Sequence, residues 1–423
     1  MITDQIKVFE AFSGIGAQAK ALERISARDN IDYELVATVD WDINAIIAYY
    51  LIHRNGYDSE KYNEIDINEI DAFLKRYTLS LDGKKALNEK SFLRLSESVK
   101  RILYAAIVET KNMVSITDVT GKDIPNGIDI FTYSFPCQDL SMCGYWHGNQ
   151  SGIARDAHNR SGMLWEVERI LKEMNENGKE LPRFLVMENV CNILSKTHKE
   201  DFDDWKNTLY SLGYVNKIYR LNAKNFGIPQ KRERAYMISV LCDNDSQKEL
   251  DVEKFFLDND LEGKITDKYR HRDLRLKDIL CLDYSDTRYK KEADDSKPND
   301  TPSRERIWNE NDLLFDGKNI NEIDVNTVTT KQDRNPNSGL IVYRNYARGK
   351  TKWRYLTPRE CFKLMGFDEI DFDNIIEQKI FDKKGKAFYT KEKLIKLAGN
   401  SIVVDVLEAI FQQIIELREL LFM

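Results

Sequence analysis

Cysteine is scarce in this chain, and long apolar runs are absent. The six cysteines (137, 143, 191, 242, 281 and 361) form no C-x-x-C pair, so the sequence indicates neither a zinc site nor a disulfide framework. No stretch approaches about 18 consecutive apolar residues, which excludes an ordinary transmembrane helix. The opening residues also lack the basic start and apolar core of a signal peptide. We therefore expect no metal, no membrane partner and a reducing, cytoplasmic location.

Positive charge is in deficit as well. The 63 lysines and arginines are outnumbered by 70 acidic residues, which gives a net charge of −7 and excludes a general polycation. A local basic face can still supply phosphate contacts, so a nucleic-acid partner is not excluded. With 423 residues, 42% of them hydrophobic, the chain is typical of a globular protein with two domains, or one domain with an insertion.

The N-terminal region predicts a strand, a glycine turn and a helix. Residues 6–12 form the strand, Ser13-Gly-Ile-Gly16 the turn, and residues 17–24 the helix. The third glycine of the dinucleotide fingerprint is missing, which disfavours a pyrophosphate-bearing cofactor. A second strand, 35–39, ends at Asp40-Trp-Asp42, where an acid can accept hydrogen bonds from ribose hydroxyls and Trp41 can stack on adenine. The pattern suits a nucleoside cofactor without phosphates, and an ordinary strand–helix turn is the alternative.

A reactive cysteine follows a second buried strand. Residues 128–134 are apolar and β-branched, Pro136 ends them, and Cys137 comes next. In an open α/β sheet, ligands bind at the carboxyl ends of the strands, where a partly exposed cysteine can act as a thiolate nucleophile. A small buried residue is the alternative reading. The loop 138–159 carries several glycines, and we expect it to close over a substrate.

Further acids and arginines are expected at the same edge of the sheet. The buried strand 184–190 ends with Glu188 and Asn189, and a buried acid is costly unless it is paired or protonated. Arg232 and Arg234 precede the strand 235–240 and point to one side if extended. Residues 113–118 predict one more strand, which ends at Asp118.

The rest of the chain divides by composition. Residues 53–112 predict an insertion of two or three helices without chemistry of its own. From residue 242 the chain becomes loop-rich, and basic residues alternate with aromatic ones in a manner that suits nucleic acid: Lys268, Tyr269, Arg270, His271, Arg272 and Arg275, then Arg344, Tyr346, Arg348, Lys350, Lys352, Trp353 and Arg354. An amphipathic helix, capped by Asn400 or Ser401, closes the chain and is expected to pack on the first domain.

Taken together, these motifs resemble the DNA (cytosine-5) methyltransferase family of the prokaryotic, modification type. The similar segments are Phe12-Ser-Gly-Ile-Gly16 (with Ala17 where a last glycine is usual), Asp40-Trp41, Asp118-Val119, Pro136-Cys-Gln138, Ser161-Gly-Met-Leu164, Glu188-Asn-Val190, Gln230-Lys-Arg-Glu-Arg234, Arg354-Tyr-Leu-Thr-Pro-Arg-Glu-Cys361 with Gly366-Phe367, and Gly399-Asn-Ser401. They occur in family order along nearly the whole chain. The insertion before Asp118 departs from the shortest members.

The resemblance implies a fold and a domain plan. It implies an α/β, Rossmann-like S-adenosylmethionine-dependent methyltransferase sheet with a smaller, loop-rich target-recognition domain. We expect a catalytic and cofactor-binding domain at 1–241, a target-recognition domain at 242–390, and a C-terminal segment at 391–423 that returns to the catalytic domain.

The resemblance also implies roles for particular residues. Cys137 would add to C6 of a flipped cytosine, Glu188 would bond N3 and N4, and Arg234 would hold O2 with Arg232 beside it. The implied S-adenosyl-L-methionine contacts are Phe12, Gly14, Ile15, Gly16, Asp40, Trp41, Asp118, Val119, Pro136, Leu164, Asn400 and Ile402. The implied DNA contacts are Gln138, Ser141, Asn189, Gln230, Arg270, Arg272 and Arg348. Double-stranded DNA is the expected partner of a monomer, with a restriction endonuclease acting separately where one exists.

Three other functions fit parts of the pattern. The related branch that methylates tRNA carries the same motifs, but its recognition region is small, whereas residues 242–355 here are long. A catalytically idle DNA-binding regulator would not need Cys137, Glu188 and Arg234 together. A nicotinamide oxidoreductase would need the third glycine and has no use for Pro136-Cys-Gln138.

Overall fold

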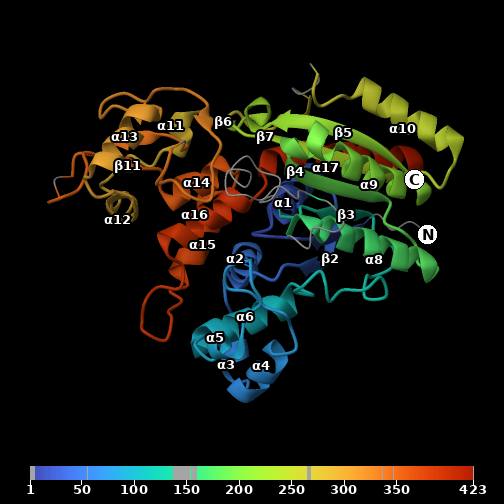
Figure 1. Ribbon diagram of the computed structural model, residues 1–423, viewed down its shortest axis with the longest axis horizontal. Coiled ribbons are helices and arrows are strands. Elements are labelled where there is room, and N and C mark those ends of the chain that lie inside the picture. Colours follow the sequence, from blue (N-terminus) through green and yellow to red (C-terminus); the bar gives the residue numbers. More distant parts are fainter. Residues whose placement is uncertain are drawn as a thin grey trace.

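A six-stranded α/β sheet forms the centre of the protein (Figure 1). The computed structural model describes residues 5–54, 56–136, 153, 160–263, 268–335, 337–345 and 347–422. The strands run in the order β2-β1-β3-β4-β7-β5. Their bounds are β1 (Ile6–Ala11), β2 (Tyr33–Val39), β3 (Ile130–Tyr133), β4 (Phe184–Val190), β5 (Tyr214–Asn222) and β7 (Glu233–Leu241).

One strand of the sheet runs against the others. β1 is parallel to β2 and β3, and β3 is parallel to β4, whereas β7 is antiparallel to both β4 and β5. The carboxyl ends of β1 to β4 therefore meet at one edge, and the amino end of β7 joins them there. The predicted α/β class is confirmed, and the reversal of β7 decides which of its residues reach that edge.

Helices cover both faces of the sheet because successive strand residues point to opposite sides. Val8, Ile130 and Val186 belong to one core cluster, while Phe9, Phe131 and Met187 belong to the other. The first cluster holds the buried residues of α1 (Ala17–Asp29), α2 (Ile43–His53) and α17 (Val404–Phe422), and the second holds those of α8 (Leu164–Glu176) and α9 (Lys199–Ser211). α10 (Ser246–Asp258) contacts β5 and α17, so this part of the predicted recognition region packs on the central domain.

The insertion is helical, as the sequence predicts, but its described residues form four helices rather than two or three. It contains α3 (Ser59–Asn63), α4 (Ile67–Leu74), α5 (Glu89–Phe92) and α6 (Glu97–Glu109), and α6 contacts both α4 and α2. The strand predicted for 113–118 is wrong. Only Asn112 bridges to β2, at Thr38, and Val114 has a φ of 65°, in the left-handed region where a strand cannot continue. The chain instead turns at 116–118.

The region after α10 is built from short elements. Its helices are α11 (Leu276–Ile279), α12 (Thr287–Asp295), α13 (Pro302–Glu310), α14 (Pro358–Leu364), α15 (Glu369–Glu377) and α16 (Lys391–Asn400). β8 (Leu313–Phe315), β10 (Leu340–Val342) and β11 (Trp353–Tyr355) form a small sheet, and β6 (Gln230–Lys231) pairs with β9 (Val325–Asn326). The short 3-10 helices are η1 (Arg160–Met163), η2 (Cys191–Leu194), η3 (Lys196–His198) and η4 (Ala223–Phe226).

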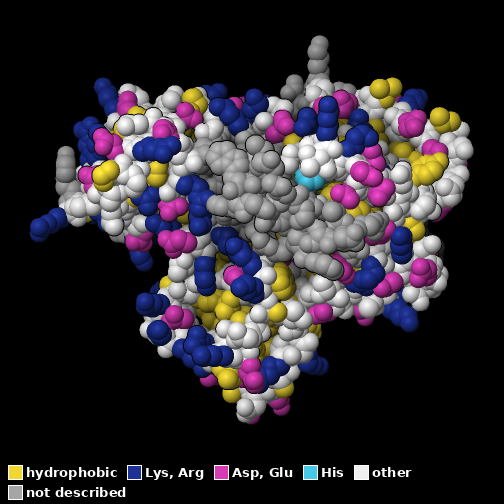
Figure 2. All heavy atoms as spheres, in the orientation of Figure 1, with side chains coloured by type: hydrophobic (Ala, Val, Ile, Leu, Met, Phe, Trp, Pro, Cys, Tyr) yellow, Lys and Arg dark blue, Asp and Glu magenta, His cyan; other side chains and the backbone are white. Residues whose placement is uncertain are grey.

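The predicted cap of the last helix is wrong. Asn400 is the final residue of α16, Ser401 follows it, and α17 begins only at Val404. A hairpin between α15 and α16, bridged at Phe381 and Ala387, lies against the insertion. Lys and Arg side chains gather over this part of the surface, at the lower left of Figure 2. No helix among the described residues is both long and apolar enough to cross a membrane.

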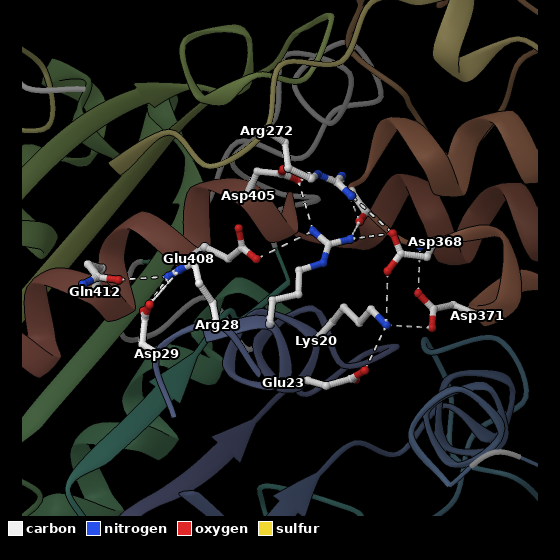
Figure 3. Close-up of polar contacts among 12 residues, drawn as sticks. Lys20, Glu23, Arg28, Asp29, Arg272, Asp368, Asp371, Asp405, Glu408 and Gln412 are labelled. Carbon is white, nitrogen blue, oxygen red and sulfur yellow. Dashed lines mark hydrogen bonds and ion pairs between the residues drawn. The ribbon is translucent and has the colours of Figure 1, made fainter. Parts of the chain in front are cut away.

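A partly buried ion network joins α1, α17 and the turn before α15 (Figure 3). Lys20 and Arg24 of α1 pair with Asp368, and Arg24 also donates to Gly366 O at 2.5 Å. Arg272 pairs with Asp405 at 2.8 Å and with Asp368 at 3.2 Å. The structure therefore uses Arg272, a predicted DNA contact, to fasten the loop after α10 to the central domain.

Candidate active site

A cavity of about 340 Å³ lies at the edge where the parallel strands end. Its walls include the ends of β1, β2, β3 and β4, and the amino end of β7, with one further wall from the end of α16. The predicted site residues that line it are Phe12, Gly14, Ile15, Asp40, Trp41, Pro136, Glu188, Asn189, Arg232, Arg234 and Asn400. Residues far apart in sequence thus meet at one cavity, as expected where the carboxyl ends of parallel strands share one edge of a sheet.

One end of the cavity is organised by Asp40. Its two carboxylate oxygens accept hydrogen bonds from Gly14 N at 2.9 Å and from Asp42 N at 2.8 Å. Burial raises the pKa of Asp40 to about 7, and the nearby Asp42 carboxylate adds to this, while the two backbone donors and Lys396 oppose it. Asp40 therefore titrates near neutral pH, and its ionised form can accept hydrogen bonds from ligand hydroxyls.

Position 16, where the glycine turn meets α2, requires glycine. Gly16 has a φ of 80°, and a Cβ built there would lie 2.1 Å from Nε2 of His53. Gly16 does not line the cavity, and it instead lets the turn sit directly on α2. The aromatic rings of Phe12 and Trp41, with the Asp40 carboxylate, fit an uncharged nucleoside portion of a cofactor. This turn lacks the third glycine typical of pyrophosphate binding, as the sequence indicates.

The other end of the cavity carries an acid–arginine pair. Oε1 of Glu188 lies 3.4 Å from Nε of Arg234. Val190 on β4 faces Arg234 on the antiparallel β7, so the reversed strand brings its first residues to the active edge. Burial raises the pKa of Glu188, and the charges of Arg234 and Arg232 oppose that rise. The pair can therefore present a carboxyl group and a guanidinium to the edge of a planar ring.

Asn189 ties the strand that carries Glu188 to the segment that follows β3. Its Nδ2 donates to Phe135 O at 3.1 Å, so β4 is tied to the segment that leads to Pro136. Pro136 lines the cavity. Cys137, Gln138 and Ser141 lie outside the described residues, and the structure gives no contact for them. The residue before Cys137 is thus fixed at the cavity that holds Glu188 and Arg234.

Arg232 and Gln230 hold the walls of the cavity together. The Arg232 guanidinium donates to Val328 O at 2.9 Å, Gly399 O at 3.2 Å and Ser401 O at 2.7 Å. Gln230 is fully buried, donates to Leu364 O and accepts from Val328 N, so it faces the interior rather than an open surface. Both side chains position segments that come from distant parts of the sequence.

Several predicted residues lie elsewhere. Asp118 is exposed and Val119 is buried in the core, because the chain turns at 116–118 instead of extending. Leu164, the first residue of α8, belongs to the same core cluster. Ser115, Ile116 and Met163 line the cavity in their place. Ile402 is buried in the other core cluster. Arg270 pairs with Asp273 and Arg348 is exposed outside the cavity lining, so their expected contacts with DNA stay predictions.

The insertion contributes a wall that sequence reasoning missed. Thr78, Asp82 and Gly83 line the cavity beside Asp42 and Lys396. Ile43 N donates to Ser80 O at 2.8 Å, and Lys396 Nζ donates to Asp42 Oδ2 at 3.0 Å and to Asp82 O at 2.7 Å. The only local signal is the Asp82-Gly83 turn, and nothing in it indicates which strand end it would meet.

The fold and the site define an α/β methyltransferase of the Rossmann-like type, with the nucleoside end and the acid–arginine end in one cavity. The family model described as C-5 cytosine-specific DNA methylase matches residues 95–416. The orphan methyltransferase M.SssI of Spiroplasma monobiae is 34% identical over 97% of this chain and 98% of its own length. The type II methyltransferase M2.ScrFI of Lactococcus lactis subsp. cremoris is 32% identical over 97% of this chain and 99% of its own.

Solved structures agree on the fold. The crystal structure of S. pombe Dnmt2 methyltransferase matches with a TM-score of 0.56 and 18% identity, and the match covers 99% of this chain and 100% of that one. The chain belongs to the C-5 cytosine-specific DNA methylase family. It is therefore a DNA (cytosine-5)-methyltransferase, and the oxidoreductase and idle-regulator alternatives are set aside.

Proposed function

We propose that this enzyme transfers a methyl group from S-adenosyl-L-methionine to C5 of a cytosine flipped out of a specific duplex DNA sequence, through a covalent adduct between Cys137 and C6. The family membership supports the reaction class. The observation that carries the finer proposal is the Glu188–Arg234 pair, 3.4 Å apart, in the cavity that Pro136 also lines. A planar ring that enters there meets both polar groups and the neighbour of Cys137.

The cofactor end of the cavity suits S-adenosylmethionine. When bound, this cofactor supplies an electrophilic methyl group on a sulfonium. Asp40 would accept hydrogen bonds from the ribose hydroxyls, and Trp41 would stack on the adenine. The backbone at Gly14 and Ile15 would approach the cofactor closely, and Asn400 would close the opposite wall of the cavity. Ser115 and Ile116 would take the positions that the sequence assigned to Asp118 and Val119.

The base end of the cavity accounts for the activation of cytosine. The Cys137 thiolate would add to C6, and the electron pair would move toward C5 and N3, so that C5 becomes enamine-like. Glu188, whose pKa is raised by burial, would hydrogen-bond N3 and N4 and support the charge that develops on the ring. Arg234 would hold O2. After C5 accepts the methyl group, loss of its proton reforms the double bond and expels the Cys137 thiolate. Because C5 and C6 lie within the duplex stack, the base must leave it to react.

A mechanism-based trap tests this chemistry. Duplex DNA with 5-fluorocytosine at the target should form a covalent complex that survives denaturing electrophoresis, because fluorine at C5 cannot leave as a proton does. Cys137→Ser should abolish both the trapped band and methyl transfer, while cofactor binding stays near that of wild type. Turnover of the serine variant within about tenfold of wild type, roughly 1.4 kcal/mol in barrier, would rule out the thiolate adduct.

Duplex DNA is favoured over tRNA as the substrate. The supporting relatives are named as type II and orphan methyltransferases, and the match covers nearly all of each chain. We propose a monomer that modifies DNA by itself, and any restriction endonuclease with the same target would act separately. Methylation of tRNA without methylation of DNA, measured with tritiated cofactor, would contradict this assignment.

We propose that the region 242–390 recognises the target DNA sequence, and the packing of α10 narrows this range. α10 packs on β5 and α17, so its surface belongs to the central domain, and the base-reading residues should lie after residue 275. Exchange of residues 276–345 for the equivalent segment of a relative with another target should change the methylated sequence and leave the chemistry intact. A folded, active chimera that still methylates the original sites, mapped by bisulfite sequencing, would place specificity elsewhere.

A further inference from the structure

A strongly basic surface lies where the insertion meets the hairpin between α15 and α16. Residues 377–396 contain seven lysines against three acids, and residues 83–94 contain four basic residues against one acid, in a chain whose net charge is −7. Figure 2 shows Lys and Arg side chains gathered over this area. The exposed members are Lys84, Lys85, Lys90, Arg94, Lys379, Lys383, Lys384 and Lys386, which we call the basic platform.

The platform is one continuous surface because its two segments are hydrogen-bonded to each other. Ser96 Oγ donates to Phe381 O at 2.7 Å, and Lys383 Nζ donates to Leu93 O at 2.6 Å. The loop that carries Lys84 and Lys85 is fixed as well, since the backbone N–H groups of both residues donate to Asp82 Oδ1. Asp82 and Gly83 line the active-site cavity, so the platform begins at the rim of that cavity.

Among the described residues, no member of the platform forms an ion pair, although the backbone N–H groups and the charges of Lys386 and Lys384 lower the pKa of Asp382 in the same hairpin. The ion pairs found along this surface involve Lys391 with Glu392 and Lys396 with Asp42, and neither lysine belongs to the platform. Some of the basic residues that the sequence singles out are held in ion pairs, while others, such as Arg344, Arg348 and Lys352, are exposed. Lys268 pairs with Glu416, Arg272 with Asp405 and Arg354 with Glu360.

We propose that the basic platform binds the phosphate backbone of duplex DNA beside the target site, so that the insertion and the hairpin act as a second, sequence-independent DNA contact. Clustered lysines without ion pairs, next to a catalytic cavity, suit the phosphates of DNA. Binding of this kind is driven mainly by the counterions that leave the phosphates when basic side chains neutralise them. The insertion, which the sequence left without a role, thereby gains one. The proposal rests on the proposed DNA substrate.

Matched double variants test the platform from each side. Lys384→Gln with Lys386→Gln alters the hairpin, and Lys85→Gln with Lys90→Gln alters the insertion, while Lys383 is kept because it joins the two segments. The control is Lys122→Gln with Lys254→Gln, which removes the same charge from exposed positions elsewhere. Circular dichroism and the Kd for S-adenosylmethionine should match wild type in all three proteins.

The readout is the salt dependence of DNA affinity, measured by fluorescence anisotropy with a labelled duplex. Each platform variant should weaken binding severalfold at low salt and should lower the slope of log Kd against log salt by about 0.9 for each lost phosphate contact. The control should keep the wild-type slope. Platform variants with the wild-type slope and affinity would overturn the proposal. A wild-type protein that neither binds nor methylates duplex DNA would instead overturn the proposed function, so the two failures are distinguishable.

Discussion

The ammonium group of Lys396 lies 3.0 Å from the carboxylate of Asp42, and this pair links α16 to the end of β2 across the nucleoside end of the cavity. The same ammonium donates to Asp82 O at 2.7 Å. Three segments that are distant in sequence, namely the residues after β2, the insertion and α16, are thereby held around Asp40 and Trp41.

Lys396→Met should weaken S-adenosylmethionine binding by roughly 0.5–1 kcal/mol, as expected for a partly exposed ion pair. The lost positive charge should also raise the pKa of Asp40 further, because Lys396 is one of the groups that lower it. The loss of affinity should therefore grow as the pH falls through about 7 and level off well below it. Isothermal calorimetry at several pH values measures it, with Lys391→Met on the same helix as the control. Equal losses of cofactor affinity in both variants would show that Lys396 has no specific role in cofactor binding.

Asp40 should make cofactor binding depend on pH. Its pKa is raised to about 7 by burial and by Asp42, and the ionised form is the better acceptor for ribose hydroxyls. Cofactor affinity of the wild type should therefore fall as the pH drops below about 7. Asp40→Ala should lose roughly 1–3 kcal/mol of binding at high pH and show a flatter profile. An unchanged affinity in this variant would mean that the cofactor binds elsewhere.

Glu10 should make folding stability fall with rising pH. It is fully buried, it accepts a hydrogen bond from the Tyr49 hydroxyl at 2.9 Å, and burial raises its pKa from 4.5 to about 8. Between these two values the unfolded chain is ionised while the folded chain keeps its proton, so this group contributes a loss of up to about 1.4 kcal/mol per pH unit.

Glu10→Gln removes that titration and keeps a carbonyl that can accept from Tyr49. Relative to wild type, the variant should therefore gain stability from pH 5 to pH 8, as urea denaturation at each pH can measure. The surface substitution Glu176→Gln serves as the control and should keep the wild-type slope. Parallel slopes for Glu10→Gln and wild type would show that Glu10 ionises freely in the folded protein.

Gly399→Ala should strain the wall between the cavity and the recognition region. A Cβ at Gly399 would lie 2.5 Å from backbone atoms of Thr329 and Thr330, and Gly399 O accepts from Arg232. We expect a cost of about 1–3 kcal/mol in unfolding free energy, together with weaker cofactor binding. Thermal denaturation and calorimetry check both effects. Gly263→Ala, where the nearest atom lies at an ordinary 3.5 Å, should change neither.

The sequence determined the class of fold and much of the catalytic apparatus. β4 occupies residues 184–190 as predicted, because the apolar run 184–187 is of the length of a buried strand and too short for a buried helix. Asp40, Pro136 and Glu188 could be placed at one edge because parallel strands share their carboxyl ends. The family motifs supplied the reaction class, and the comparisons confirmed it.

Tertiary structure decided what depends on contacts between distant segments. The direction of β7 brings Arg234 to Glu188, and no local pattern states that direction. The left-handed conformation of Val114 ends the expected strand and moves Ser115 and Ile116 to the cavity in place of Asp118 and Val119. Arg272 looks like a DNA contact in sequence, yet it pairs with Asp405 more than a hundred residues away. Charge and hydrophobicity are local properties of a sequence, whereas the partner that neutralises a charge is chosen only when the chain packs.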